Sequence, residues 1–368
     1  MYNFPEKALG PDFASDKMKQ FRQLIDANLS FVVISLPGVG VSCFLKFLAV
    51  QDFATFIHVD LYSLPSLSLH EFYKLLLTEL GGKPSGKSDE RLIEEIKKNL
   101  RELSQKRGKI VIIFSRFDQL KNQFNPTFLS NIQSLTTISN SPVVEIFTST
   151  KPLYKIAPDA LTGGNLNFYS EELYFKPYTK DDLKKLLKVD LAKPVSASVL
   201  DELMDLSGGH NQLFRILLSS QKQQNLSLDR FVKMQMKELV DYLDYHQRKQ
   251  LQKLALGKTV EEIDEYLEGV GLVKNSQIFT PLLSEYIKTN MPVRLPAKEN
   301  ILFKLLKENI GKTVTKDEIF AAVWPDSEEA TDWALDALIY RMRNHPYLKA
   351  QGYIIESQKK VGYTLIAS

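Results

Sequence analysis

The stretch Phe31-Val-Val-Ile-Ser-Leu-Pro-Gly-Val-Gly-Val-Ser-Cys-Phe-Leu-Lys-Phe47 decides how the rest of the chain is interpreted. It begins with an apolar, β-branched run, passes through a turn of proline and glycine, and continues with apolar residues at helical spacing. This order predicts a strand, a tight loop and a helix. Because such a loop can direct backbone N–H groups toward one point, the stretch is a candidate phosphate-binding turn.

The turn follows the P-loop pattern only in part. Gly38, Gly40 and Ser42 stand where that pattern requires them, but Ser35 replaces the first glycine and Val41 replaces the lysine. A lysine ammonium about 4 Å from a phosphate oxygen contributes on the order of 4 kcal/mol at an effective dielectric constant of about 20. The sequence therefore retains the shape of the loop and loses its main positive charge.

Length and composition are those of an ordinary globular protein. The chain has 368 residues, of which 44% are hydrophobic and 25% charged, enough for about two to three domains. A net charge of +3 is too small to indicate a basic surface over the whole molecule. The single cysteine excludes an internal disulfide and fits a reducing compartment.

The termini and apolar segments predict a cytoplasmic protein. The first residues lack a basic segment followed by an apolar one, so we expect no secretory signal. The longest uncharged apolar stretch, 31–45, contains a proline and two glycines and is shorter than the roughly 18 residues that span a bilayer. We therefore expect no membrane contact.

Strand-like and helix-like segments alternate through the first half of the chain. Apolar runs of strand length occur at 55–60, 109–114, 143–147 and 166–175, and the segments between the earlier runs show helical periodicity. This alternation predicts a parallel sheet with helices on both faces.

From Thr179 the chain becomes helical, which predicts a lid. After the lid we expect two short helices, at 245–256 and 260–270, and a hairpin over 271–280.

The motifs in these segments resemble those of the STAND branch of AAA+ ATPases. The resemblance runs through 31–48 as Walker A, 111–120 as Walker B and 147–150 as the polar strand end called sensor 1. It continues through 175–183 into the lid and through 207–215 at the sensor 2 position. It implies an α/β P-loop NTPase domain, a helical lid and a small winged helix after the lid.

The Walker B segment departs from the family at its two functional positions. The resemblance implies an Asp that orders magnesium and a Glu that polarises water, but the chain has Ser115 and Arg116 there. Neither residue can do that work, so we predict no catalytic residue, no metal site and no ATP hydrolysis. Asp118 is a candidate replacement carboxylate, and a solvated loop acid is the interpretation we favour.

Two interpretations of the glycine turn stay open. In one, the turn is only a structural strand-to-helix connection, and Arg215 is a surface residue of a lid helix. In the other, ATP or ADP still binds weakly, with Arg116 or Arg215 replacing the lost charge. The residues of that weak nucleotide site would be Gly38, Val39, Gly40, Val41, Ser42, Arg116 and Arg215.

The C-terminal segment resembles an OmpR/PhoB-type winged helix. Residues 295–324 look like its opening helices and end in a tryptophan, and residues 335–343 look like its recognition helix. Residues 353–365 look like its wing hairpin, which ends in Gly-Tyr. The resemblance implies that double-stranded DNA is a partner.

The predicted DNA contacts follow from the helix period. Apolar residues recur at core spacing along 335–342, which turns Tyr340 and Arg341 toward another face. The segment 297–368 holds ten Lys and Arg against ten Asp and Glu, so affinity for DNA is expected to be modest. The predicted DNA-binding residues are Tyr340, Arg341, Arg343, Lys359 and Lys360.

These observations predict four domains and a regulatory function. The domains are a P-loop ATPase-like domain (1–176), a helical lid (177–234), a first winged helix (235–290) and a C-terminal DNA-binding winged helix (291–368). We expect a transcriptional regulator with a degenerate, non-hydrolysing nucleotide-binding module. The alternatives are an active ATP-dependent switch or initiator and a scaffold that binds protein partners.

Overall fold

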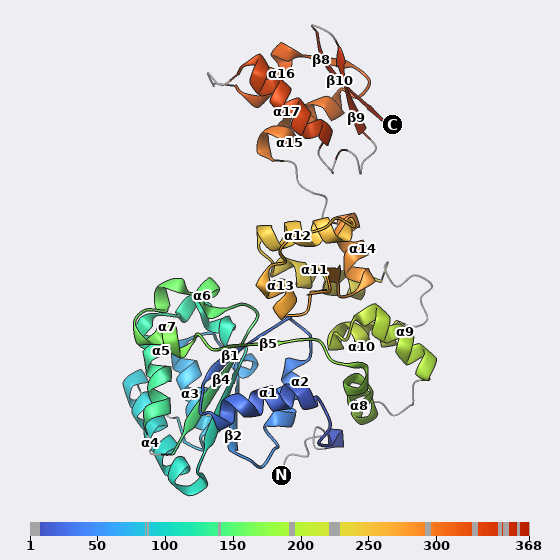
Figure 1. Cartoon of the computed structure of the whole chain (residues 1–368). Helices are drawn as coiled ribbons and strands as arrows, with labels where there is room; N and C mark the ends of the chain where they lie inside the picture. The colour runs from blue at the N-terminus through green and yellow to red at the C-terminus, as the bar shows by residue number, and fades with distance from the viewer. Residues whose placement is uncertain are drawn as a thin grey trace. The chain divides into compact units, whose positions relative to one another are not determined.

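The computed structural model describes residues 8–84, 86, 88–138, 141–190, 196–220, 229–290, 296–325, 330–344, 348, 353–358 and 361–367. The chain divides into two compact units, residues 1–248 with 259–283 and residues 249–258 with 284–368. Figure 1 shows the helices and strands of both units.

The first unit contains a parallel sheet of five strands in the order β2-β3-β4-β1-β5. All four strand pairings are parallel, and Phe31 of β1 lies opposite Ile146 of β4. This topology is that of the P-loop NTPase fold, so the predicted fold class is confirmed. The strands are β1 (Phe31–Ser35), β2 (Thr55–Asp60), β3 (Ile110–Ser115), β4 (Val143–Ser149) and β5 (Glu172–Phe175).

Helices cover both faces of this sheet (Figure 1). On one face, Phe21 of α1 packs edge-on against Phe31 and against Phe44 of α2. On the other face, Phe72 of α3 contacts Phe114 of β3. These aromatic layers bury both sides of the central strands, which explains their continuous apolar sequence. The helices are α1 (Ser15–Asp26), α2 (Val41–Leu48), α3 (Leu69–Glu79), α4 (Asp89–Arg107), α5 (Pro126–Gln133), α6 (Leu153–Ile156) and α7 (Gly164–Phe168).

The lid and the elements after it also follow the predicted order, with two corrections. Residues 164–168 form the short helix α7, so the fifth strand begins at Glu172 and not at Leu166. Helix α13 begins at Glu265, where Asp264 caps it, and not at Val260. The elements are α8 (Lys180–Asp190), α9 (Ala197–Ser207), α10 (Asn211–Ser219), α11 (Arg230–Asp241), α12 (Tyr245–Ala255), α13 (Glu265–Gly269), β6 (Val273–Lys274), β7 (Gln277–Ile278) and α14 (Pro281–Asn290).

The C-terminal part of the second unit is a winged helix. Its strands form an antiparallel sheet in the order β8-β10-β9, and its core includes Leu335, Leu338, Ile339 and Met342. This confirms the predicted core face of the recognition helix and the hairpin of the wing. The elements are α15 (Ala297–Glu308), β8 (Thr313–Thr315), α16 (Lys316–Val323), α17 (Asp332–Asn344), β9 (Tyr353–Gln358) and β10 (Gly362–Ala367). Among the described residues, no helix combines the length and the apolar character needed to cross a bilayer.

A buried carboxyl group lies in the middle of the sheet. Glu145 of β4 is fully buried, and neither of its carboxyl oxygens has a hydrogen-bond partner among the described residues. Burial raises the pKa of Glu145 well above its usual value. A carboxyl whose pKa is higher in the folded chain favours the fold only while it is protonated, so its ionisation destabilises the sheet as the pH rises.

We therefore expect Glu145→Met to increase the free energy of unfolding at about pH 8 by roughly 1–3 kcal/mol. The gain should shrink as the pH falls below the usual carboxyl range, because the carboxyl is then protonated in both states. Urea unfolding across this pH range measures the effect, with Glu94→Met on the exposed face of α4 as the control. A gain that does not depend on pH would contradict the assignment.

Candidate functional site

The glycine turn between β1 and α2 has the backbone form of a phosphate-binding loop. Gly38 and Gly40 both have positive φ angles, 76° and 106°, and α2 begins directly afterwards at Val41. Glycine adopts these angles without the clash that a Cβ atom introduces. The structure therefore brings Gly38, Val39, Gly40, Val41 and Ser42 together as predicted, with the Val41 side chain where the P-loop pattern has a cation.

The lid binds this turn through its carbonyl groups. The fully buried His210 directs Nε2 to the Pro37 carbonyl at 2.8 Å, and the Gln212 amide donates to the Gly38 carbonyl at 2.9 Å. Nδ1 of His210 accepts the Leu213 amide, so the proton lies on Nε2. Two hydrogen bonds thus hold the start of α10 against the turn, and the bond from the Leu213 amide orients the His210 ring.

A second part of the lid packs on the same turn. The hydroxyl of the buried Tyr178 donates to the Gly40 carbonyl at 2.9 Å. A Cβ atom at Gly40 would lie only 2.6 Å from the Tyr178 ring and 3.0 Å from Cβ of Asn211. The Asn211 amide also reaches Sγ of Cys43 in α2. Lid side chains therefore already contact the turn and the first turn of α2.

The carboxyl end of β3 carries no free acid. Ser115 is buried, and its hydroxyl lies 2.6 Å from Nε2 of His58. Arg116 forms an ion pair with Asp60 at 2.6 Å. Asp118 accepts the amide and the hydroxyl of Thr150 at 2.9 and 2.7 Å. The expectation of a solvated Asp118 is therefore wrong, because this side chain anchors the end of β4.

The residues of the turn do not fit a magnesium nucleotide. Val41 cannot pair with a phosphate, and Asp118 is already committed to Thr150. Tyr178 and Asn211 pack closely against the turn at Gly40. Among the described residues, no three His, Cys, Asp or Glu side chains converge as metal ligands.

The two arginines proposed to replace the lost cation have other contacts. Arg116 pairs with Asp60 and lies 4.8 Å from the Tyr62 ring centre. Arg215 donates from Nε to the Asn211 side chain at 3.3 Å, which keeps it beside the lid segment that covers the turn. A nucleotide role for either arginine stays a prediction.

On the winged helix, α17 presents a mixed exposed face. Tyr340 is 70% exposed and Trp333 is 81% exposed. Arg341 donates from Nε to the buried Glu299 at 2.9 Å, and its side chain remains more than half exposed. An arginine fixed at Nε still has its two terminal nitrogens as donors, so Glu299 orients Arg341 and leaves those donors unused by this ion pair.

The structure describes only one of the three remaining predicted DNA-binding residues, Arg343. Arg343 donates to the Ile355 carbonyl at 2.9 Å and to the Ser357 hydroxyl at 2.7 Å, so it connects α17 to the wing. Lys359 and Lys360 lie outside the described residues. Tyr340, Arg341 and Arg343 all lie near the C-terminal end of α17.

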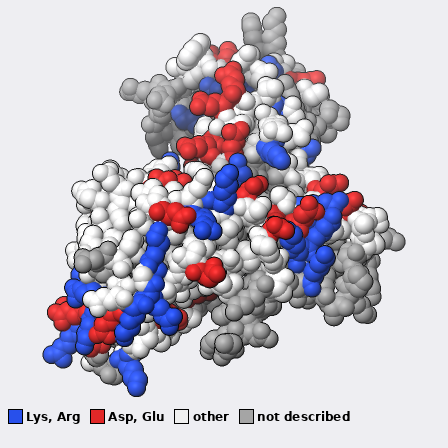
Figure 2. Space-filling model, turned by 60° about the horizontal axis from the view of Figure 1, so that its bottom comes forward, with Lys and Arg blue, Asp and Glu red and all other residues white. Residues whose placement is uncertain are grey.

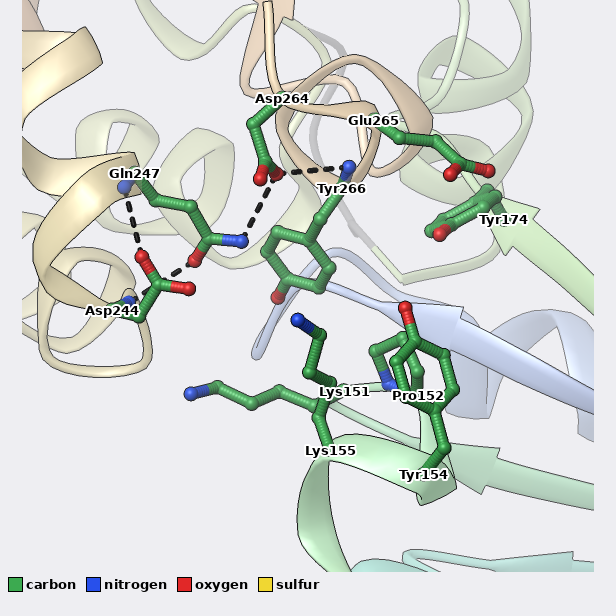
Figure 3. Close-up of a pocket in the computed structure, with 10 residues that line it drawn as sticks. All are labelled: Lys151, Pro152, Tyr154, Lys155, Tyr174, Asp244, Gln247, Asp264, Glu265 and Tyr266. Atoms are coloured by element: carbon green, nitrogen blue, oxygen red, sulfur yellow. Dashed lines mark hydrogen bonds between the residues drawn. The ribbon is translucent and has the colours of Figure 1, made fainter. Parts of the chain in front are cut away.

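The sequence analysis missed a set of lysines at the carboxyl edge of the sheet. Lys151 lies two residues after β4, Lys155 follows four residues later in α6, and Lys121 lies after β3. Lys151 and Lys155 line two cavities of about 280 and 660 Å³, of which Figure 3 shows the smaller. Two lysines four residues apart after a polar strand end were the signal in the sequence.

Charge elsewhere on the surface is mixed. The face drawn in Figure 2 shows basic and acidic side chains interspersed. This agrees with the net charge of +3 and the equal numbers of charges in 297–368. Any site for an anion or for DNA must therefore be local.

The strand order and the glycine turn before α2 define the first unit as a P-loop NTPase fold. Residues 290–365 match the family described as "Transcriptional regulatory protein, C terminal". The C-terminal resemblance is therefore confirmed. No curated protein matches the chain.

Several solved structures are similar to the chain. A DNA complex of the Aeropyrum pernix ORC1 protein is 14% identical, with 98% of this chain and 91% of that one covered at a TM-score of 0.41. A Walker-type ATPase of Pyrococcus abyssi is 15% identical over 76% and 96%, with a TM-score of 0.49. The ADP form of the Aeropyrum pernix ORC2 protein is 12% identical over 82% and 86%, with a TM-score of 0.43. The strand order by itself identifies the fold.

The contact between the lid and the turn should weaken in acid. Burial lowers the pKa of His210 from 6.5 to about 4, so the unfolded chain binds a proton over a pH range in which the folded chain does not. The stability contributed by neutral His210 is complete above about pH 6.5 and is lost as the pH falls toward 4.

We expect this residue to account for up to about 3 kcal/mol of lost stability over that range. His210→Gln removes the titration and keeps a side-chain donor for Pro37. Urea unfolding of parent and variant at several pH values compares them. An equal loss of stability in both proteins would show that His210 does not titrate as described.

Proposed function

We propose that the protein is a transcriptional regulator that binds double-stranded DNA through its C-terminal winged helix. The observation that carries this proposal is the match of residues 290–365 to the C-terminal domain of transcriptional regulatory proteins. The pre-oriented Arg341 supports it, because a planar guanidinium with two unused terminal nitrogens suits the O6 and N7 acceptors of guanine. Arg343 would position the wing, and Lys359 and Lys360 would contact phosphates.

We further propose that the P-loop module acts without hydrolysing ATP. Val41, Ser115 and Arg116 replace the charged groups that phosphoryl transfer requires, and the lid covers the turn. Residual binding of ATP or ADP by the turn belongs to this proposal as a weak property. The four domain boundaries, the STAND assignment and a cytoplasmic location also remain proposals.

One observation favours a second function. Trp333 and Tyr340 are large, exposed aromatic residues on α17, and such residues are enriched at protein interfaces. The alternative of a protein-binding winged helix therefore has α17 as its surface. Binding to duplex DNA separates the two functions.

We expect the full chain to select sites from a pool of randomised duplexes and to bind them with an affinity that falls steeply with salt. Arg341→Ala should reduce the preference for the selected site over a scrambled one by about 1–3 kcal/mol. Lys359→Ala with Lys360→Ala should weaken binding to both duplexes and flatten the salt slope by roughly one to two units.

Arg341→Lys is the matched control, because it keeps the charge and removes the planar pair of donors. It should bind the scrambled duplex like the parent and still lose preference for the selected site. If the parent binds no duplex, the transcriptional proposal fails and α17 is a protein-binding surface. Equal preference in parent and Arg341→Ala would remove Arg341 from base recognition.

A further inference from the structure

We propose that the protein has an anion site at the carboxyl edge of its sheet, separate from the glycine turn, that binds a phosphate-bearing small molecule without magnesium. The site is the cavity of about 660 Å³ lined by Arg116, Lys121, Lys151 and Lys155. A cavity of this size suits a small metabolite. It also lies beyond the carboxyl ends of β3 and β4, where open α/β sheets bind ligands.

The positive charge in this cavity is only partly neutralised by the described part of the protein, because Arg116 pairs with Asp60 and the lysines of the lining do not form such pairs there. The ammonium groups of Lys121, Lys151 and Lys155 have no carboxylate within ion-pair distance among the described residues. Figure 3 shows Lys151 and Lys155 extending from one wall of the adjoining cavity toward the elements that carry Asp244 and Tyr266. These two lysines line both cavities, so they present their charge to the space between the walls.

The acidic groups of the larger cavity already hold donors. Asp118 accepts two hydrogen bonds from Thr150, and Asp241 pairs with Lys237. Arg116 pairs with Asp60 through Nη1, which leaves it other donors. Three lysines and the Asp118 carboxylate remain outside these ion pairs, so the lining of the cavity has an excess of about two positive charges to offer a ligand.

The number of charges selects the class of ligand. A carboxylate would neutralise one lysine, whereas a phosphate monoester carries close to two negative charges and three acceptor oxygens. Lysine ammonium groups suit this ligand because they bind phosphate as point charges and need no metal bridge. Among the described residues of the cavity, the carboxylates of Asp118 and Asp241 already have partners, and no cluster of metal-ligating side chains occurs. A complex with an anion and no metal ion therefore fits the lining.

The site is connected to the domain that follows the lid. The Thr150 amide and hydroxyl donate to Asp118, and the Thr150 carbonyl accepts the Tyr266 hydroxyl at 2.7 Å. Tyr266 belongs to α13 of the predicted first winged helix. An anion on Lys151 would therefore lie one residue from the hydrogen bond between the sheet and α13, which makes the cavity suited to an effector.

Inorganic pyrophosphate is the probe for this site. We expect it to raise the melting temperature of the full chain in the absence of magnesium, relative to sodium chloride of equal ionic strength. Lys151→Gln with Lys155→Gln should weaken pyrophosphate binding, measured by titration calorimetry, by at least about tenfold. The melting temperature without ligand verifies that this variant folds.

Two variants locate the anion. Lys97→Gln with Lys98→Gln on α4 removes the same charge elsewhere and should bind pyrophosphate like the parent. Ser42→Ala alters the glycine turn and reports any pyrophosphate that binds there. Parent-like binding by the Lys151 and Lys155 double variant, with or without loss of binding in Ser42→Ala, or no binding by the parent would each overturn the proposal. Pyrophosphate binding is measured without DNA. Failure of this experiment would therefore not contradict the proposed transcriptional function.

Discussion

The hydrogen bond from His210 to the Pro37 carbonyl joins residues that are 173 positions apart, and the arrangement of the first unit depends on it. It places the start of α10 on the turn that follows β1. Tyr178, which lies at the start of the lid, forms a second contact with the turn by donating its hydroxyl to the Gly40 carbonyl. Side chains and one backbone amide of the lid thus connect the lid to the turn directly.

The changes of charge at the sheet edge are consistent with this arrangement. The turn has Val41 where the P-loop pattern has a lysine, and the carboxyl end of β3 has Ser115 and Arg116. The same edge carries Lys151 and Lys155, which line a cavity instead of the turn. Metal-dependent chemistry needs acids at this edge, and binding of a simple anion needs cations. This difference in charge is the basis of the two proposals for the sheet edge, an anion site and a module that does not hydrolyse ATP.

The sequence predicted the parts of the fold that depend on local pattern. Strands such as 109–114 were clear because long apolar β-branched runs are buried on both faces, and α17 was clear because its core residues recur at the helix period. The fifth strand was misplaced because 164–168 is too short to show periodicity. The contacts of Tyr178, His210 and Asn211 could not be predicted, since they join segments far apart in sequence. Arg341 was placed on the correct helix, but its orientation by Glu299 depends on tertiary packing.

Hydrogen exchange at the lid amides that depend on its contact with the turn tests the central claim most directly. The Gln212 amide donates to Gly38, the Leu213 amide to His210, and the Tyr178 amide to the Gly209 carbonyl. If the lid is joined to the turn by its own side chains, these amides exchange slowly in the free protein, and magnesium with ATP leaves their rates unchanged. Rapid exchange that becomes slow only when magnesium and ATP are added would show that a nucleotide organises the lid, which would contradict the account.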